Sequence, residues 1–275
     1  MNKIKFFILI FATILVSVPA YSQTKKIKPK KAKTTAVVEN IMPEPIPHKA
    51  KPDSHPKALK KPNLVYYAST GDGTHGFDIS HYQGRIDWNQ LSKDPNCGFV
   101  YLKATEGPTF RDDTYKYNFN ECKRTGVKVG SYIFFRQNCT PQAQFDNFVS
   151  FVETHKQDLI PMVDVEYSPR GITIASFHDR ILSLCELIEK EYGVKPLIYT
   201  GRNFYNKYFH GYPAFRGYKF WIANYTTIQP VLSGNDDYLI WQYSGHGKAQ
   251  GVRGEIDLNK FVGRHSLREI MYNGR

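Results

Sequence analysis

From residue 75 onward, short apolar runs alternate with segments whose apolar residues recur at helical spacing. The runs with the length and composition of strands are 75–80, 98–104, 127–135, 159–166, 195–200, 219–225, 237–243 and 255–261. Helical patterns at 111–126, 140–156, 172–193 and 201–209 separate the earlier runs, and loops with little helical signal join the later ones. Alternation of this kind is typical of parallel strands connected by crossover helices.

Eight such strands in one domain predict an α/β fold, an irregular TIM-like β/α barrel with helices mainly around its first half. An open, doubly wound sheet is the alternative topology. No GxGxxG motif follows the first strand, so nothing in the sequence indicates the dinucleotide site that often accompanies an open sheet.

The first 22 residues have the pattern of a signal peptide. Lys3 and Lys5 precede an apolar run of 13 residues, and Ala20 and Ser22 are the small residues that a signal peptidase needs. The run is short for a membrane span, although an uncleaved N-terminal anchor is the alternative. We therefore expect export, to the periplasm or the medium.

Residues 23–62 are rich in Lys and Pro and nearly lack aromatic residues, which predicts a disordered linker before a catalytic domain at 63–275. This segment carries a net charge of +8, and residues 1–22 carry +2, out of a total of +12. The folded domain is therefore almost neutral at +2, and the basic composition is no argument for nucleic acid. We expect the linker to contact an anionic wall or membrane surface, or to be a solvated spacer.

The stretch "PMVDVEYSP" places Asp164 and Glu166 two residues apart in an otherwise apolar run. On a strand both side chains point to the same face, about 6–7 Å apart. Two carboxylates at that range repel, so one should keep its proton to a higher pH. An acid at the end of a strand can cap the helix that follows, but only one acid of a same-face pair can do so. An unequal pair of acids is what cleavage of a glycosidic bond requires.

Three more acids fall at the ends of other predicted strands: Asp78, Glu106 and Asp257. Active sites of β/α barrels gather at the carboxyl ends of their strands. We therefore predict that Asp164, Glu166, Asp78 and Asp257 form a catalytic group, with Glu106 beside the substrate.

Aromatic side chains also fall near these strand ends. They are Tyr132, Tyr199, Trp221, Trp241 and Tyr243. Flat aromatic rings can stack on sugar faces, so these residues are predicted walls of a sugar-binding cleft; the alternative is that they are core.

Seven segments in register resemble glycoside hydrolase family 25, the Chalaropsis-type lysozymes. They are "GFDISHYQGRIDW", "VYLKATEG", "PMVDVEYS", "LIYTGRNFY", "FWIANY", "LIWQYS" and "GEIDLNKF". The resemblance implies an N-acetylmuramidase that cuts the β-1,4 bond after N-acetylmuramic acid in peptidoglycan. It implies that Glu166 is the general acid and Asp164 its assisting partner, with Asp78, Asp257 and Glu106 in the same site.

The resemblance implies no metal or organic cofactor, and we expect a monomer acting on glycan strands. One departure is Ile133, where the family commonly has His. Whether Asp164 is a nucleophile or orients the N-acetyl group of the substrate stays open. A chitinase-like hydrolase and a non-catalytic peptidoglycan-binding domain are the alternative functions.

The cysteines are Cys97, Cys122, Cys139 and Cys185, and their spacing matches no metal motif. The helical pattern at 172–193 places Cys185 on a buried helix face. Free buried thiols and at least one disulfide both remain open.

Overall fold

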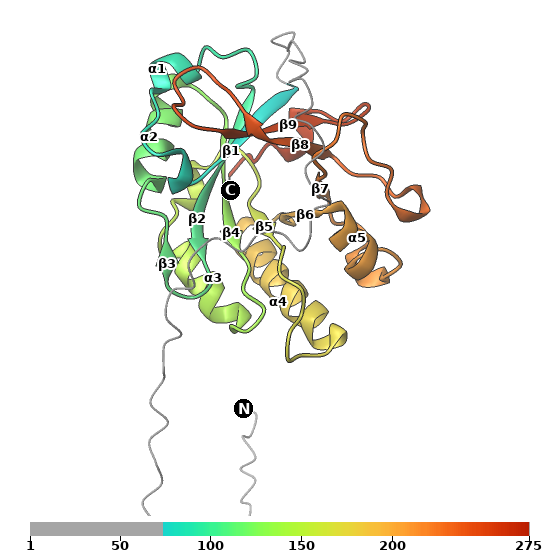
Figure 1. Cartoon of the computed structure of the whole chain (residues 1–275). Coiled ribbons are helices and arrows are strands. Elements are labelled where there is room, and N and C mark those ends of the chain that lie inside the picture. The colour runs from blue at the N-terminus through green and yellow to red at the C-terminus, as the bar shows by residue number, and fades with distance from the viewer. Residues whose placement is uncertain (1–73, 275) are drawn as a thin grey trace, which may run out of the picture. The chain divides into compact units, whose positions relative to one another are not determined.

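The computed structural model describes residues 74–274, and eight of its strands close into a barrel. In order around the barrel they are β1 (His75–Ile79), β2 (Phe99–Glu106), β4 (Val129–Phe134), β5 (Met162–Asp164), β6 (Leu197–Gly201), β7 (Phe220–Ala223), β8 (Ile240–Gly247) and β9 (Ile256–Phe261). The first strand pairs with both β2 and β9, which completes the ring (Figure 1). The predicted barrel is confirmed, and every predicted strand is present.

One strand runs against the expected direction. All neighbouring pairs from β1 to β8 are parallel, but β9 is antiparallel to both β8 and β1. A parallel connection needs a crossover of a dozen or more residues, whereas the segment 248–255 that joins β8 to β9 is short. Asp257 therefore lies near the start of its strand, yet at the same rim as the carboxyl ends of the parallel strands.

Helices cover the first part of the barrel, as predicted. They are α2 (Tyr115–Thr125), α3 (Pro141–Val149), α4 (Ile174–Tyr192) and α5 (Arg202–Tyr208). Between β7 and β9 the described chain contains no α-helix, so the outer layer is incomplete there (Figure 1). The short α1 (Trp88–Leu91) and the two-residue strand β3 (Phe110–Arg111) had too weak a pattern to predict.

Local sequence explains where the longer helices begin and end. The side chain of Thr140 accepts a hydrogen bond from the amide of Ala143, and Pro141 occupies the first turn of α3. Thr173 caps α4 in the same way. Gly193 ends α4 with a φ of 73°, a left-handed conformation that glycine adopts without steric cost.

The interior of the barrel is filled by aromatic rings. Trp221 is fully buried, with its ring centroid 5.3 Å from that of Tyr101 and 6.1 Å from that of Phe99. Gly130 on β4 makes room for this cluster, because a Cβ there would lie 2.7 Å from the Tyr101 ring. The barrel is thus a packed core, and its chemistry is confined to one rim.

All four cysteines are free thiols. Cys185 lies on the buried face of α4 beside Leu184 and Ile188, as its helical spacing predicted. Burial raises the pKa of Cys97 to about 12 and, with the charge of nearby Asp94, keeps this thiol protonated and unreactive.

The predicted signal peptide and linker lie outside the described residues. Within 74–274, none of the helices has the length and apolar character that a bilayer crossing requires.

Candidate active site

A cleft opens at the barrel rim where β1, β4, β5 and β6 end. It encloses about 190 Å³. Its lining residues are Asp78, Ser80, Tyr82, Gln83, Lys103, Tyr132, Phe134, Met162, Asp164, Glu166, Tyr199, Tyr225 and Asp257. The structure therefore brings together the four acids that sequence patterns placed in one group.

Asp164 and Glu166 lie on one face, as their spacing predicted. Met162, Asp164 and Glu166 all line the cleft, whereas the alternate residues Val163 and Val165 are fully buried on the opposite side. Asp164 is buried, and Glu166 presents an exposed surface to the cleft.

A hydrogen bond joins the carboxyl groups of Asp164 and Glu166. Burial, followed by the charge of Glu166, raises the pKa of Asp164 well above its ordinary value. Burial also raises the pKa of Glu166, although the hydrogen bond from Asp164 and the charges of Lys103 and Arg136 oppose this effect. Burial and the neighbouring carboxyl group therefore favour a proton on this pair of acids.

The Oδ1 atom of Asp164 is buried, and no donor group of residues 74–274 bonds to it. Buried polar atoms are nearly always satisfied. A proton shared with Glu166, or an N–H group of a bound substrate, can satisfy this oxygen.

Asp78 and Asp257 form a second carboxyl pair. They are directly opposite each other in the antiparallel register of β1 and β9, and a hydrogen bond joins them. Burial and the charge of Asp78 raise the pKa of Asp257 well above its ordinary value. Burial also raises the pKa of Asp78, against the opposing effect of its hydrogen bonds.

Two buried amides hold Asp78 in place. Asn259 donates to its Oδ1 at 2.7 Å, and Gln242 donates to its two oxygens at 3.0 and 3.1 Å. Gln242 in turn accepts hydrogen bonds from the hydroxyls of Tyr199, at 2.7 Å, and Tyr225, at 2.8 Å. The orientation of Asp78 is thus fixed by a chain of contacts that spans several strands.

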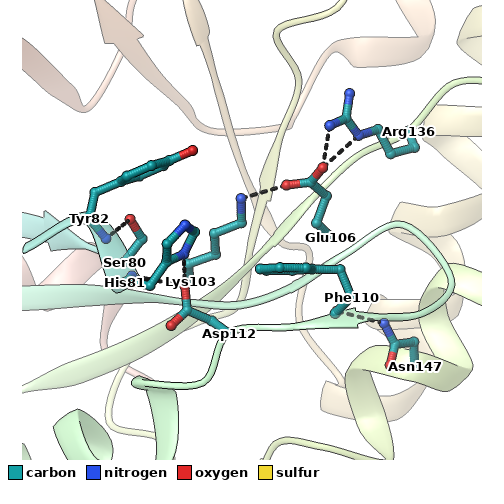
Figure 2. A network of polar contacts seen from close by, with 9 residues as sticks. All are labelled: Ser80, His81, Tyr82, Lys103, Glu106, Phe110, Asp112, Arg136 and Asn147. Atoms are coloured by element: carbon teal, nitrogen blue, oxygen red, sulfur yellow. Dashed lines mark hydrogen bonds and ion pairs between the residues drawn. The ribbon is translucent and has the colours of Figure 1, made fainter. Parts of the chain in front are cut away.

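Glu106 does not line the cleft but supports a residue that does. The buried Lys103 donates to Glu106 at 2.6 Å, and Arg136 forms an ion pair with the same carboxylate (Figure 2). Burial would raise the pKa of Glu106, but the charges and hydrogen bonds of Lys103 and Arg136 outweigh it and lower that pKa. Lys103 also lies 4.8 Å from the ring centre of Phe134, a favourable cation–π contact.

The predicted aromatic walls divide into two groups. Tyr132 and Tyr199 line the cleft. Trp221 lies deeper in the barrel and donates to Asn259, while Trp241 donates to the carbonyl of Asn224. Neither tryptophan lines the cleft, because the aromatic interior takes up Trp221 and strand alternation turns Trp241 away from the face that carries Gln242.

Ile133, the departure from the family pattern, is also away from the cleft. It is fully buried, and its neighbours Tyr132 and Phe134 are the residues that line the cleft. The carboxyl groups are therefore unaffected by this substitution.

Sequence reasoning missed Lys103, which lines the cleft, and the buried amide Gln242, which holds Asp78. A charged residue within the apolar run "VYLKAT" was a usable signal for Lys103. Gln242 was recognisable only as pointing opposite to Trp241 and Tyr243. Tyr82 lies in a short 3-10 helix, His81–Gln83, and Tyr225 lies beyond the end of β7 although it falls within the predicted strand 219–225.

A closed β/α barrel with two carboxyl pairs at one rim defines the class of this protein as a glycoside hydrolase. A family model for "Glycosyl hydrolases family 25" matches residues 77–252. The chain belongs to that family.

Known relatives agree with this assignment. The Escherichia coli (strain K12) protein YegX is 32% identical over 194 residues, which cover 69% of this chain and 70% of YegX. Lysozyme M1 of Streptomyces globisporus is 31% identical over 209 residues, which cover 70% of this chain and 68% of that lysozyme.

Solved structures show the same fold. A family 25 glycosyl hydrolase from Bacillus anthracis matches with a TM-score of 0.62 at 33% identity, over 70% of this chain and 89% of that one. A bacterial lysozyme from Streptomyces coelicolor matches with a TM-score of 0.64 at 29% identity, over 72% of this chain and 95% of that one.

Proposed function

We propose that the protein is a muramidase that hydrolyses the β-1,4 bond between N-acetylmuramic acid and N-acetylglucosamine in peptidoglycan. Membership of family 25 and the similarity to Lysozyme M1 support this substrate. The observation that carries the chemistry is the hydrogen-bonded pair Asp164 and Glu166, which faces one cleft.

In this proposal Glu166 is the general acid. It is the member of the pair that is exposed to the cleft, where a leaving oxygen can approach. A bound glycan displaces water from Glu166, which favours its neutral form and raises its pKa. The proton shared with Asp164 then moves to the carboxyl group beside the scissile bond.

Asp164 assists in this scheme and does not attack the sugar. Once it has given up its proton, it is a buried carboxylate next to the reaction centre. It can accept the N–H of the 2-acetamido group, whose carbonyl oxygen attacks the anomeric carbon as the bond to the leaving group breaks. The carboxylate then stabilises the cyclic cation. Asp78 and Asp257 flank this centre, and the amides that hold Asp78 fix its position.

Product analysis tests the proposal directly. Purified peptidoglycan digested with the protein should give fragments with muramic acid at the reducing end, identified by mass spectrometry after borohydride reduction. Reducing-end N-acetylglucosamine would contradict the assignment, and comparable digestion of chitin would favour a chitinase-like activity. Binding of peptidoglycan without release of fragments would favour the non-catalytic alternative.

We further propose that residues 1–22 direct export and that 23–62 tether the enzyme electrostatically. A chain lacking 23–62 should keep its melting temperature and its activity on soluble glycans. It should bind anionic vesicles more weakly at low salt, and sedimentation of those vesicles measures the change. Unfolding of the shortened chain would show that the segment belongs to the folded structure.

A further inference from the structure

Two exposed tyrosines line the cleft. Among the large apolar side chains that are exposed in residues 74–274, Tyr82, with 60% of its surface accessible, and Tyr225, with 51%, are the two that also face the carboxyl groups. Tyr82 lies in the 3-10 helix His81–Gln83 after β1, and Tyr225 follows β7, so they come from different segments. An exposed aromatic ring at a concave site is a surface available for a ligand.

The ring of Tyr82 rests on a fixed support. Its centroid lies 4.2 Å from that of His81, with an angle of 38° between the planes. His81 is held twice by the fully buried Asp112, through its ring Nδ1 at 2.8 Å and its backbone amide at 3.0 Å (Figure 2). The Tyr82 ring is therefore positioned before any ligand arrives.

The ring of Tyr225 is fixed at its hydroxyl. This group donates to Gln242 at 2.8 Å, and Gln242 donates to Asp78. Gly245 packs beside the ring, since a Cβ at that position would lie 3.5 Å from Cζ of Tyr225, at ordinary van der Waals distance. The exposed face of Tyr225 is thus rigidly connected to the acid pair Asp78 and Asp257.

The two rings are on different sides of the cleft. In the barrel order, β8 and β9 separate β7 from β1. The charged groups that act on the two hydroxyls agree with this arrangement. After burial itself, the groups that raise the pKa of Tyr225 include Asp257, Asp78 and Glu166, whereas those that raise the pKa of Tyr82 include Glu106 and Asp112. The strand β9, which lies between β7 and β1 in this order, carries the acid Asp257.

We propose that Tyr82 and Tyr225 are two stacking platforms, each of which binds the apolar face of one sugar ring, on opposite sides of the bond that is cut. This inference rests on the proposed glycan substrate. A tyrosine that is already immobilised offers a large contact surface at little cost in side-chain entropy. The cleft then holds at least two consecutive sugars, and the bond between them lies at Asp164 and Glu166.

Binding can be measured without turnover in a full-length Glu166→Gln background. The probe is a tetrasaccharide of alternating N-acetylglucosamine and N-acetylmuramic acid, and isothermal titration gives its Kd. Tyr82→Ala and Tyr225→Ala should each raise the Kd by about tenfold, a typical effect of truncating an aromatic anchor. Tyr212→Ala is the matched control, because Tyr212 is also an exposed tyrosine, 37% accessible, packed against a histidine, but outside the cleft.

Two further measurements examine how each ring acts. Tyr225→Phe keeps the ring but loses the bond to Gln242 that fixes it, so its affinity for the tetrasaccharide should lie between those of the parent and of Tyr225→Ala. In the active enzyme, Tyr82→Ala should raise KM and leave kcat largely unchanged, because the lost contact is made equally in the ground and transition states.

Unchanged affinity in both alanine variants, or failure of the parent to bind the tetrasaccharide, would overturn the proposal. Equal losses in Tyr225→Phe and Tyr225→Ala would show that the hydroxyl and not the ring face matters at that position. If the wild type does not cleave peptidoglycan while the alanine variants still lose affinity for the tetrasaccharide, the muramidase assignment is wrong but the role of the two tyrosines in binding is supported.

Discussion

Glu106 and Asp164 are both buried acids at the same end of one barrel, yet their environments act in opposite directions. Glu106 has Lys103 on one side and Arg136 on the other, and its pKa is lowered. Asp164 has another carboxyl group as its neighbour, and its pKa is raised well above the ordinary value. Burial is common to both, so the partner decides whether a buried acid stays charged.

The difference separates two uses of a carboxyl group. The lowered pKa of Glu106 favours its ionised form, which pairs with Lys103 beside the cleft. For Asp164 with Glu166, and for Asp257 with Asp78, burial and the neighbouring carboxyl group raise the pKa values and favour the protonated form. Pairs of acids whose pKa values differ commonly supply the general acid and the general base in enzymes.

The strongest test of this comparison is Glu166→Gln. An amide cannot donate the proton that the leaving oxygen needs, so kcat on peptidoglycan should fall on the order of 10²–10⁴-fold with an unchanged melting temperature. Turbidity clearing and thermal denaturation measure the two quantities. Glu186→Gln, an exposed glutamate on α4, is the matched control. Near-normal activity of Glu166→Gln would remove it from the catalytic role.

Asp164→Asn should slow the enzyme on the order of 10²-fold, because the developing cation loses its counter-charge. In the wild type, loss of the last proton from Asp164 and Glu166 leaves two neighbouring negative charges. Their repulsion keeps that proton bound to a higher pH, so the basic limb of the pH–rate profile lies at high pH. In the variant the only proton is that of Glu166, so the basic limb should move to lower pH. A glycosyl adduct on Asp164, found by peptide mass mapping of the quenched wild type, would show that it is the nucleophile instead.

Lys103→Met removes a cation that lines the cleft together with the acid pairs, and its effect should have the opposite sign. The charge of Lys103 lowers the pKa of both Asp164 and Glu166, so its loss should move the basic limb to higher pH, with less than about a tenfold change in kcat/KM. Lys116→Met is the control, since its ammonium also lies over an aromatic ring, 5.3 Å from the centre of Phe151, but outside the cleft. A shift to lower pH would contradict the assigned electrostatics.

The smallest effect is expected on stability, in Asp257→Asn. The pKa of Asp257 is raised on folding, so the folded state binds the proton more tightly and wild-type stability falls as pH rises from the unfolded toward the folded pKa. The variant removes this penalty. A gain of about 1 kcal/mol at neutral pH corresponds to a rise of about 2–4 °C in Tm.

That gain should disappear below about pH 4, where the carboxyl group is protonated in both states. Differential scanning fluorimetry across pH measures it. Asp113→Asn, at an exposed position outside the cleft, should show no such pH-dependent gain. A variant less stable than the wild type at neutral pH would mean that Asp257 is ionised there and stabilising.

Local patterns in the sequence were sufficient for the strands, the longer helices and the acid pair on β5. A period of two puts Asp164 and Glu166 on one face whatever the rest of the chain does. The direction of β9 depends on the connection from β8, which has no clear helical or turn pattern, so the sequence analysis did not predict that β9 is antiparallel. The aromatic residues show the same limit. Trp221 and Trp241 belong to strands and pack into the protein interior, whereas Tyr82 reaches the cleft from a short 3-10 helix and Tyr225 from the segment after β7.

Closure of the barrel by its first and last strands has a consequence for how the enzyme becomes active. Asp78 comes from β1, and its partners Gln242, Asp257 and Asn259 come from β8 and β9, up to 181 residues later in the chain. Contacts of such high contact order form late in folding, because the intervening chain must be ordered first. The cleft is therefore assembled only when synthesis of the domain is complete, and a truncated or partly folded chain carries an incomplete set of acids.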